Sequence, residues 1–409
     1  DDELEDLKDY GYRMGDLVGR AGLEKQYETY LKGTDGGTQI EVDSRGRETR
    51  VIGIKEPHPG RDLYLTIDIA LQAACDKLLG DRKGAICVTN PVTGEVLALA
   101  SHPAFDPNVF VVPDASDERV ALLKDRIGRP LSNRAISGLY APGSVFKMVT
   151  ASAAMETKKV TANTSFVCTG SYHIGKAKFD CWKAEGHGPQ NAVQGFMNSC
   201  DVYFYSAGRL AGVDAMEHYA KLYGFGQATG IDLPDEVKGI APGRSWKKRA
   251  RHSNWFEGDT INYSIGQGYL LTTPIQVAVM TGVVAANGSL ARPYIVKRIG
   301  DVAIHAGKPK NIGVSQRTID VIREGLYDVV NNPDGTGKRA KAEGVIAAGK
   351  TGTAENPQGR THAWFTGFAP YSNPKICLVV FLEHGGKGGL MPSEIARGIF
   401  EEARRKGYL

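Results

Sequence analysis

The stretch LYAPGSVFKMVTASAAMET, residues 139–157, places a serine and a lysine at the start of an apolar helix. Pro142 and Gly143 favour a break before this helix, and Ser144 and Lys147 follow three positions apart. A helix would bring their hydroxyl and amine to one face. A buried lysine with a lowered pKa can take the proton of a serine and make it a nucleophile. The pattern therefore predicts a candidate nucleophile, with a helix-capping role for Ser144 as the simpler alternative.

The same Ser-x-x-Lys spacing occurs twice more, and the surroundings distinguish the three copies. The copy at residues 245–248 lies in a strongly basic stretch, where we expect Lys247 and Lys248 to remain solvated. The copy at residues 372–375 contains a proline, which does not fit a helical register. Only Ser144 precedes an apolar helix, whose N-terminal dipole would also favour a developing alkoxide.

Two further motifs follow at wide spacing. The tripeptide SCD at residues 199–201 precedes an apolar helix, and alone it is most simply a helix cap. The tetrapeptide KTGT at residues 350–353 follows small residues that predict a strand, along which a substrate backbone could lie as an extra strand. Alone it is most simply a surface turn. The three motifs in this order are typical of penicillin-binding proteins and class A β-lactamases, in which the middle motif usually ends in Asn.

Over nearly its whole length the chain resembles the class B penicillin-binding proteins, and among them the penicillin-binding protein 2 branch. The resemblance is carried by segments such as NPVTGEVLALASHPAFDPN, LYAPGSVFKMVTA, GDTINYSIGQGYLLTTPIQVA and AAGKTGTAE. It implies an α+β, penicillin-binding/serine β-lactamase-like transpeptidase domain: a central antiparallel sheet flanked by helices, plus an all-helical subdomain. The order of strands, then helices, then strands agrees with that class. We expect part of a membrane-proximal pedestal or dimerisation-type domain over residues 1–60 and the transpeptidase domain over residues 61–409.

The resemblance also implies catalytic roles. Ser144 would attack the penultimate D-Ala of a stem peptide that ends in D-Ala-D-Ala, and Lys147 would take the serine proton. Ser199 and Asp201 would connect Lys147 to the leaving amine. Asp201 is acidic where most of the superfamily has Asn, so it would also hold Lys147 protonated more of the time.

The third motif would bind the substrate. Lys350 and Thr351 would hold the substrate carboxylate, and Gly352 would leave room for the substrate backbone. The backbone N–H groups of Ser144 and Thr353 would form the oxyanion hole.

The family implies a peptidoglycan DD-transpeptidase of cell elongation and rod shape that β-lactams acylate and that needs no cofactor for its chemistry. It would act on the periplasmic side of the bacterial inner membrane, anchored by an N-terminal transmembrane helix absent from this chain. Its implied partners are peptidoglycan stem peptides, β-lactam antibiotics and, through the N-terminal region, a membrane glycan polymerase with other elongation-complex proteins. The alternatives are a DD-carboxypeptidase, a serine β-lactamase, and a β-lactam-binding sensor or scaffold that activates the polymerase.

A second cluster of reactive side chains contains Cys168, Cys181, His187 and Cys200, spaced by 13, 6 and 13 positions. Three thiolates and one imidazole would make a closed, structural zinc site. The family resemblance points to the same metal, since some relatives bind zinc in this region. A disulfide between Cys168 and Cys181 and a set of free thiols are the alternatives.

Composition excludes several other classes of protein. The chain has 409 residues, 42% hydrophobic and 23% charged, which is typical of globular domains. Its 50 Lys and Arg against 46 Asp and Glu leave a net charge of +4, and the densest basic stretch, residues 244–251, is one short patch. We therefore expect no nucleic-acid partner. No apolar run approaches the roughly 18 residues that a membrane span needs.

Overall fold

The computed structural model describes residues 11–13, 15–304, 307–356 and 359–409. The first ten residues of the expected N-terminal domain, and residue 14, lie outside the described residues.

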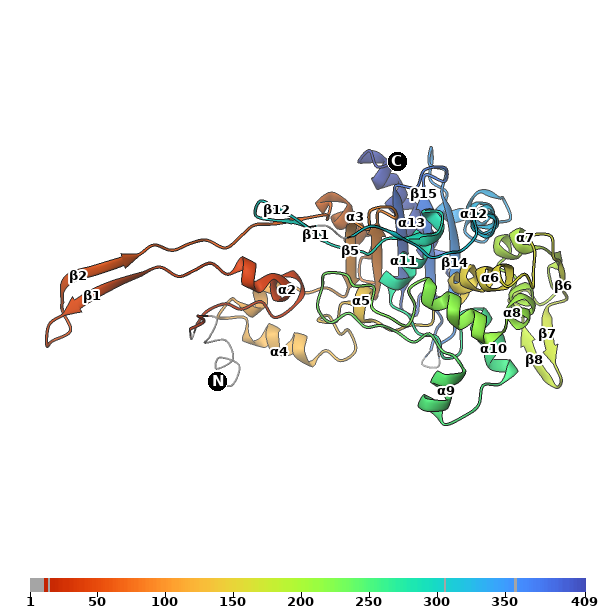
Figure 1. Ribbon diagram of the computed structural model, residues 1–409, viewed down its shortest axis with the longest axis horizontal. Coiled ribbons are helices and arrows are strands. Elements are labelled where there is room, and N and C mark those ends of the chain that lie inside the picture. The colour runs from red at the N-terminus through yellow and green to blue at the C-terminus, as the bar shows by residue number, and fades with distance from the viewer. Residues whose placement is uncertain (1–10, 14, 305–306, 357–358) are drawn as a thin grey trace.

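A five-stranded antiparallel sheet forms the centre of the molecule, with the strand order β14-β15-β16-β4-β5 (Figure 1). Its strands are β4 (Gly84–Thr89), β5 (Val96–His102), β14 (Ala348–Ala354), β15 (His362–Ala369) and β16 (Ile376–Leu382). The pairing of β16 with β4 joins the strands that precede the helical part of the chain to those that follow it. This confirms the predicted α+β class.

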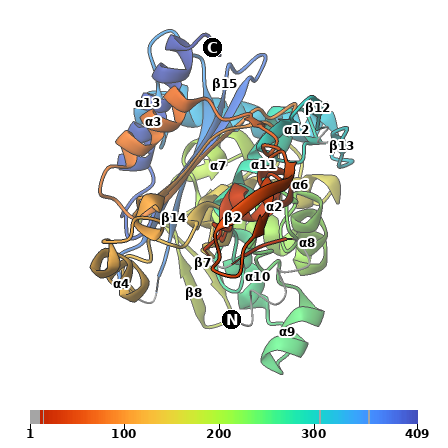
Figure 2. The same ribbon diagram turned by 90° about the vertical axis from the view of Figure 1, so that its left-hand side faces the viewer.

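Helices cover both faces of this sheet. Alternate side chains of a strand point to opposite faces, so Cys87 and Val379 join the larger core while Ile86 and Val380 join the smaller one. The smaller core is completed by α3 (Ile69–Leu79) and α13 (Met391–Arg405), which lie together on one side of the sheet (Figure 2). The larger core contains α6 (Lys147–Glu156), α8 (Asp201–Leu222) and α11 (Pro274–Ala285).

The start of α11 illustrates how the sequence determines these helices. Thr273 and Gln276 form a capping box around Pro274, and every residue of the helix is buried. A proline in the first turn costs no hydrogen bond, because its missing N–H would have no partner within the helix.

The middle of the chain is mostly helical, but residues 166–190 form strands. This segment forms two small antiparallel pairs, β6 (Phe166–Cys168) with β9 (Gly188–Gln190), and β7 (Ser171–Ile174) with β8 (Ala177–Asp180). Gly170, Gly175, Gly186 and Gly188 all have positive φ. Such backbone ends helices and forms tight turns, which explains the difference.

The N-terminal segment forms α2 (Gly22–Leu31) and a hairpin of β1 (Gly37–Val42) and β2 (Glu48–Lys55). The hairpin extends away from the rest of the molecule (Figure 1), and both of its strands are exposed throughout. The segment is attached through β3 (Leu63–Leu65), which pairs with β11 (Val296–Ile299).

The remaining described helices and strands cover or connect the elements above, and apart from α12 they are short. The helices are η1 (Pro107–Phe110), α4 (Ser116–Lys124), α5 (Arg134–Ser137), η2 (Gly143–Phe146), α7 (Ala192–Met197), α9 (Arg244–Arg251), α10 (Glu257–Ser264), α12 (Gln316–Asn331) and η3 (Lys338–Ala340). The strands are β10 (Ser289–Leu290), β12 (Val302–Ala303) and β13 (Lys310–Asn311). None of the described helices combines the length and hydropathy that crossing a membrane requires.

Candidate active site

The predicted nucleophile lies on η2, a 3-10 turn that leads directly into α6. Side chains three positions apart eclipse each other in such a turn, which places Ser144 and Lys147 on the same side. Ser144 is partly exposed, whereas Lys147 is completely buried. No side chain caps η2 or α6, so the capping alternative for Ser144 is not supported.

A glycine allows η2 to lie directly against β14. Gly143 has a φ of +57°, and a Cβ atom at this position would lie 2.5 Å from the carbonyl oxygen of Thr353. Gly352 faces the same contact from β14, where a Cβ would lie 3.0 Å from the oxygen of Pro142. The two glycines therefore let the backbones of the first and third motifs approach each other beside Ser144.

The side chains of the three motifs meet at Ser199. The Lys147 amine donates to the Ser199 carbonyl oxygen and to Asp201 Oδ1, both at 2.8 Å, and its Nζ lies 3.3 Å from Ser199 Oγ. The Lys350 amine donates to the same Oγ at 2.8 Å and to the carbonyl of Thr351 at 2.8 Å. The structure thus brings Lys147, Ser199, Asp201 and Lys350 into one hydrogen-bonded cluster.

The middle motif is not a helix cap. Cys200 is the residue before α8, and no side chain caps this helix. Ser199 has a φ of +50°, which is uncommon for a residue other than glycine. Its hydroxyl oxygen instead accepts hydrogen bonds from the amines of Lys147 and Lys350. This backbone conformation is held by the surrounding contacts and places the hydroxyl between Lys147 and Lys350.

Burial dominates the electrostatics of the cluster. Lys350 is completely inaccessible to solvent, and desolvation lowers its pKa well below the usual value. The nearby charge of Lys147 lowers this pKa further, whereas the charge of Asp201 acts in the opposite direction. The second oxygen of Asp201 accepts a hydrogen bond from the backbone N–H of Trp182 at 3.1 Å.

The third motif is a strand and not a surface turn. Lys350, Thr351, Gly352 and Thr353 lie within β14, where only Thr353 is exposed. In the described part of the chain β14 pairs with β15 on one side and forms an edge of the five-stranded sheet. An edge strand can accept an extended peptide as an additional strand.

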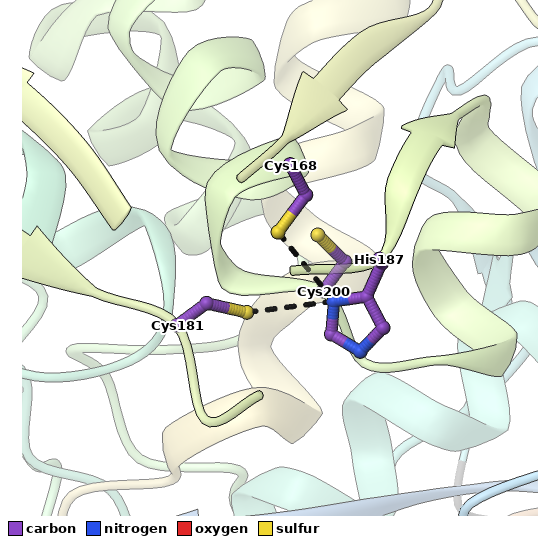
Figure 3. A group of neighbouring side chains, drawn as sticks. All are labelled: Cys168, Cys181, His187 and Cys200. Atoms are coloured by element: carbon purple, nitrogen blue, oxygen red, sulfur yellow. Dashed lines mark hydrogen bonds between the residues drawn. The ribbon is translucent and has the colours of Figure 1, made fainter. Parts of the chain in front are cut away.

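Cys168, Cys181, His187 and Cys200 form a compact group of potential metal ligands (Figure 3), with their ligand atoms all within 4.8 Å of one another. His187 Nδ1 lies 3.6 Å from the sulfurs of both Cys168 and Cys181. Tetrahedral zinc, with metal–sulfur distances of about 2.3 Å and metal–nitrogen distances of about 2.0 Å, separates S and N ligands by about 3.5 Å. The donor set and its spacing therefore fit zinc.

The other cysteine arrangements fit this geometry less well. All six cysteines are free and buried, so the structure contains no Cys168–Cys181 disulfide. A hydrogen bond from the Cys200 thiol is the largest cause of a strongly lowered pKa at Cys181, and His187 adds to it. Cys75, Cys87 and Cys377 lie in the cores on the two faces of the sheet.

Sequence reasoning did not identify two residues that support the cluster. Trp182 holds Asp201 through its backbone N–H, so no side-chain pattern could have revealed it. Thr336 accepts a hydrogen bond from Thr351 Oγ1 at 3.2 Å. It lies in a turn 15 residues from Thr351, where spacing alone gives no signal.

Comparison with known proteins agrees with this geometry. Residues 84–401 match the family model described as the penicillin binding protein transpeptidase domain. The chain belongs to this family. Residues 1–65 also match the penicillin-binding protein dimerisation domain.

Relatives in the penicillin-binding protein family are similar over most of this chain. The peptidoglycan D,D-transpeptidase MrdA of Acinetobacter baumannii is 36% identical, with 98% of this chain and 62% of that protein covered. The protein of the same name from Escherichia coli K12 is 35% identical, with 91% and 62% covered. The chain thus spans a little under two thirds of the length of these curated relatives.

Solved structures of penicillin-binding proteins confirm the fold class. A complex of PBP2 and MreC from Helicobacter pylori matches with a TM-score of 0.90 and 34% identity, covering 99% of this chain and 76% of that chain. Pseudomonas aeruginosa PBP2 in complex with WCK 5153 matches with a TM-score of 0.87 and 34% identity, covering 98% and 84%.

Proposed function

We propose that this protein is a serine DD-transpeptidase that cross-links peptidoglycan during cell elongation. The observation that carries the proposal is the convergence of Lys147 and Lys350 on the Ser199 hydroxyl, next to the nucleophile turn that holds Ser144. Relatives that cover almost the whole chain are named peptidoglycan D,D-transpeptidases.

In the first step, Ser144 Oγ attacks the carbonyl carbon of the penultimate D-Ala. A C–O bond forms, the peptide C–N bond breaks, and the last D-Ala leaves as a free amine. The Lys147 amine in its neutral form accepts the serine proton, which then passes through the Ser199 hydroxyl to the leaving nitrogen. Asp201 keeps the buried Lys147 in position through their 2.8 Å ion pair.

The edge of β14 binds the substrate. Thr351 contacts the terminal carboxylate, while the buried Lys350 amine holds the strand and Ser199 in place through hydrogen bonds to the Thr351 carbonyl and the Ser199 hydroxyl. The N–H groups of Ser144 and Thr353 stabilise the oxyanion as it forms. Gly352 carries no side chain that would obstruct the added strand.

In the second step, the amine of a neighbouring stem peptide attacks the acyl-enzyme and regenerates Ser144, which forms the cross-link. A DD-carboxypeptidase would use water instead of the amine, so the product distinguishes the two reactions. β-Lactams acylate the same serine because their strained amide replaces the D-Ala-D-Ala bond. None of these steps requires a cofactor.

The test is the intact mass of the protein after brief exposure to benzylpenicillin. We expect an adduct on the wild type and on Ser245→Ala, which changes a serine outside the site, and none on Ser144→Ala. An unmodified protein with intact drug would support the scaffold alternative instead. An unmodified protein with hydrolysed drug would identify a β-lactamase. Incubation with a stem pentapeptide and an acceptor amine then separates cross-linked product from hydrolysed tetrapeptide.

We further propose that residues 1–60 belong to a pedestal that binds a membrane glycan polymerase on the periplasmic side of the inner membrane. The β1–β2 hairpin exposes apolar side chains, including Val51, Ile52 and Ile54. A solved structure that is 36% identical to this chain is described as "Structural coordination of polymerization and crosslinking by a peptidoglycan synthase complex". Replacing Ile52 and Ile54 by Asp should abolish co-purification with the polymerase and leave penicillin acylation intact.

We also propose a structural zinc ion held by Cys168, Cys181, His187 and Cys200. Four protein ligands leave no position for water, so such an ion fixes local structure and takes no part in the reaction. The peptide N–H that holds Asp201 belongs to Trp182, the neighbour of Cys181, and Cys200 itself precedes Asp201. Fixing the two cysteines would therefore fix the carboxylate that pairs with Lys147.

A further inference from the structure

A cavity of about 1240 Å³ opens next to the nucleophile turn, at the end of β14 that follows Thr353. Its wall includes Ala141, three residues before Ser144, and Glu355, two residues after Thr353. The cavity therefore lies along the continuation of the strand edge on which we place the substrate. The reaction described above assigns no role to it.

The side chains that line this cavity have an excess of positive charge. Lys83, Arg126, Arg129 and Arg134 face two carboxylates, Glu355 and Glu383. Arg134 is 3% exposed, and its Nε donates to Glu383 Oε1 at 2.9 Å. The Tyr140 hydroxyl donates to the same oxygen at 2.5 Å. Glu383 is thus already paired with Arg134, which leaves Glu355 as the one other carboxylate of this lining against Lys83, Arg126 and Arg129.

The loop that carries Arg126 and Arg129 is held in place by buried and charged groups. The Arg134 guanidinium donates to the carbonyl oxygen of Gly128 at 2.5 Å and to that of Arg129 at 3.3 Å. The Lys83 amine donates to the carbonyl of Ile127 at 3.0 Å. No carboxylate pairs with Arg126 or Arg129 among the described residues. Two guanidinium groups on an anchored loop are thus available to an anion in the cavity.

The proposed substrate geometry gives the direction in which a peptide would reach them. If Thr351 holds the terminal carboxylate and Thr353 faces the scissile carbonyl, the peptide runs antiparallel to β14, and its upstream residues pass Glu355. An extended chain advances about 3.3 to 3.6 Å per residue. The second and third residues upstream of the scissile bond would therefore enter the cavity.

We infer that this cavity is a subsite for the upstream part of the donor stem peptide, and that Arg126 and Arg129 select donors that carry a free carboxylate there. The inference rests on the proposed transpeptidase function. Guanidinium groups bind carboxylates through paired, charge-assisted hydrogen bonds, so the recognised group is an acidic residue and not its amide. Cross-linking would then depend on the amidation state of the stem peptide as well as on its D-Ala-D-Ala end.

The experiment compares two synthetic stem pentapeptides that both end in D-Ala-D-Ala. One carries a free carboxylate upstream of the terminal pair, and in the other this group is an amide. Their dissociation constants are measured by calorimetry on Ser144→Ala protein, which binds the peptide without turnover. The same measurement is repeated after adding Arg126→Glu with Arg129→Glu, and after adding Arg249→Glu, a matched change on the exposed face of α9.

We expect the acidic peptide to bind on the order of tenfold more tightly than the amide, with a preference that weakens as salt is added. The Arg126→Glu/Arg129→Glu protein should lose or reverse the preference, and the Arg249→Glu protein should keep it. Equal affinities in the parent protein, or a preference that survives Arg126→Glu/Arg129→Glu, would overturn the inference.

Penicillin acylation separates this inference from the function on which it rests. The melting temperature of Arg126→Glu/Arg129→Glu, compared with that of the parent protein, shows that the variant is folded. Acylation of the wild type without a peptide preference overturns only the subsite. Absence of acylation on the wild type overturns the proposed function, and the subsite with it.

Discussion

Lys147 and Lys350 direct their amines at the same oxygen, Oγ of Ser199, from two different elements of the fold, at distances of 3.3 and 2.8 Å. Both side chains are completely buried. Asp201 pairs with Lys147 through a 2.8 Å contact. Two buried amines therefore share one nearby carboxylate, so adding a second proton to the pair is unfavourable. In the proposed mechanism, one of the two amines is therefore left unprotonated, and the cluster can accept the proton of Ser144.

The first prediction concerns the pH dependence of stability. Because the pKa of Lys350 is lowered in the folded protein, the unfolded chain holds a proton that the folded chain lacks at pH values between that pKa and 10.5. Stability due to this residue therefore rises with pH across that interval. The unfolding free energy of the wild type, compared with that of Lys350→Met, should therefore rise as the pH rises. The rise is at most about 1.4 kcal/mol per pH unit.

Urea denaturation of both proteins at pH 7, 8.5 and 10 measures this difference. The exposed Lys375 provides a control, since Lys375→Met should leave the pH slope of the wild type unchanged. A difference that stays constant, or falls as pH rises, would show that burial of Lys350 is not linked to protonation.

The second prediction concerns Asp201. Asn keeps an oxygen acceptor for the Trp182 N–H but loses the charge that pairs with Lys147, which breaks a buried ion pair. We expect Asp201→Asn to lower the unfolding free energy by about 3 kcal/mol. Because the Asp201 charge raises the pKa of Lys350, its loss should also move the acid limb of the acylation rate to lower pH.

Acylation by benzylpenicillin, followed from pH 5 to 9, tests the second part of this prediction. Asp180→Asn changes an exposed carboxylate of β8 and should leave the profile unaltered. If the acid limb of Asp201→Asn stays in place or moves to higher pH, the charge of Asp201 does not control the protonation of the two lysines.

The third prediction separates backbone strain from steric contact at the nucleophile turn. Gly143 and Gly175 have nearly the same φ, +57° and +56°, but a Cβ at Gly175 would meet nothing within 4 Å. Gly175→Ala should cost only the left-handed strain of about 1 to 2 kcal/mol. Gly143→Ala adds a contact with the Thr353 oxygen, so η2 must move away from β14 and Ser144 with it.

We therefore expect penicillin acylation of Gly143→Ala to slow at least about tenfold, while Gly175→Ala retains the wild-type rate. Unfolding free energies, measured alongside, quantify the strain that both variants share. Equal acylation rates in the two variants would mean that the contact between η2 and β14 does not position the serine.

The fourth prediction concerns the proposed zinc. Metal analysis of the purified protein should give about one zinc per chain, and Cys168→Ser should reduce it strongly. Cys75→Ser changes a buried cysteine outside the cluster and should leave the metal content unchanged. Chelation should lower the melting temperature of the wild type more than that of Cys168→Ser. A protein without metal, or an equal loss in Cys75→Ser, would favour free thiols.

The sequence predicted those features whose cause is local. The placement of Ser144 and Lys147 on one side of a helical turn depends on residues only three positions apart. The positions of Ser199 and Lys350 next to this pair depend on contacts across 151 residues, and only the family resemblance suggested them.

Two features could not be predicted from the sequence, because they depend on tertiary contacts. Lys247, expected to be solvated, is buried against Asp259 at 2.5 Å, with the rings of Phe256 and Tyr269 nearby. The basic cavity is likewise assembled from segments far apart in the sequence, so neither Arg126 nor Arg129 belongs to a recognisable motif. The spacing of residues within one helix or strand cannot predict a site that is built from distant segments.

The pairing of β4 with β16 sets a condition on how the protein is made. Thr89 lies opposite Cys377, and Gly84 lies opposite Leu382. The ribosome must therefore add almost 300 residues after β4 before the strand that completes the sheet exists. Until then one edge of β4 is unsatisfied, a state in which nascent chains aggregate. Long-range pairing of this kind also slows folding. Reactivity with penicillin would then serve as a reporter of completed synthesis and folding, because the reacting segments come together only in the finished chain.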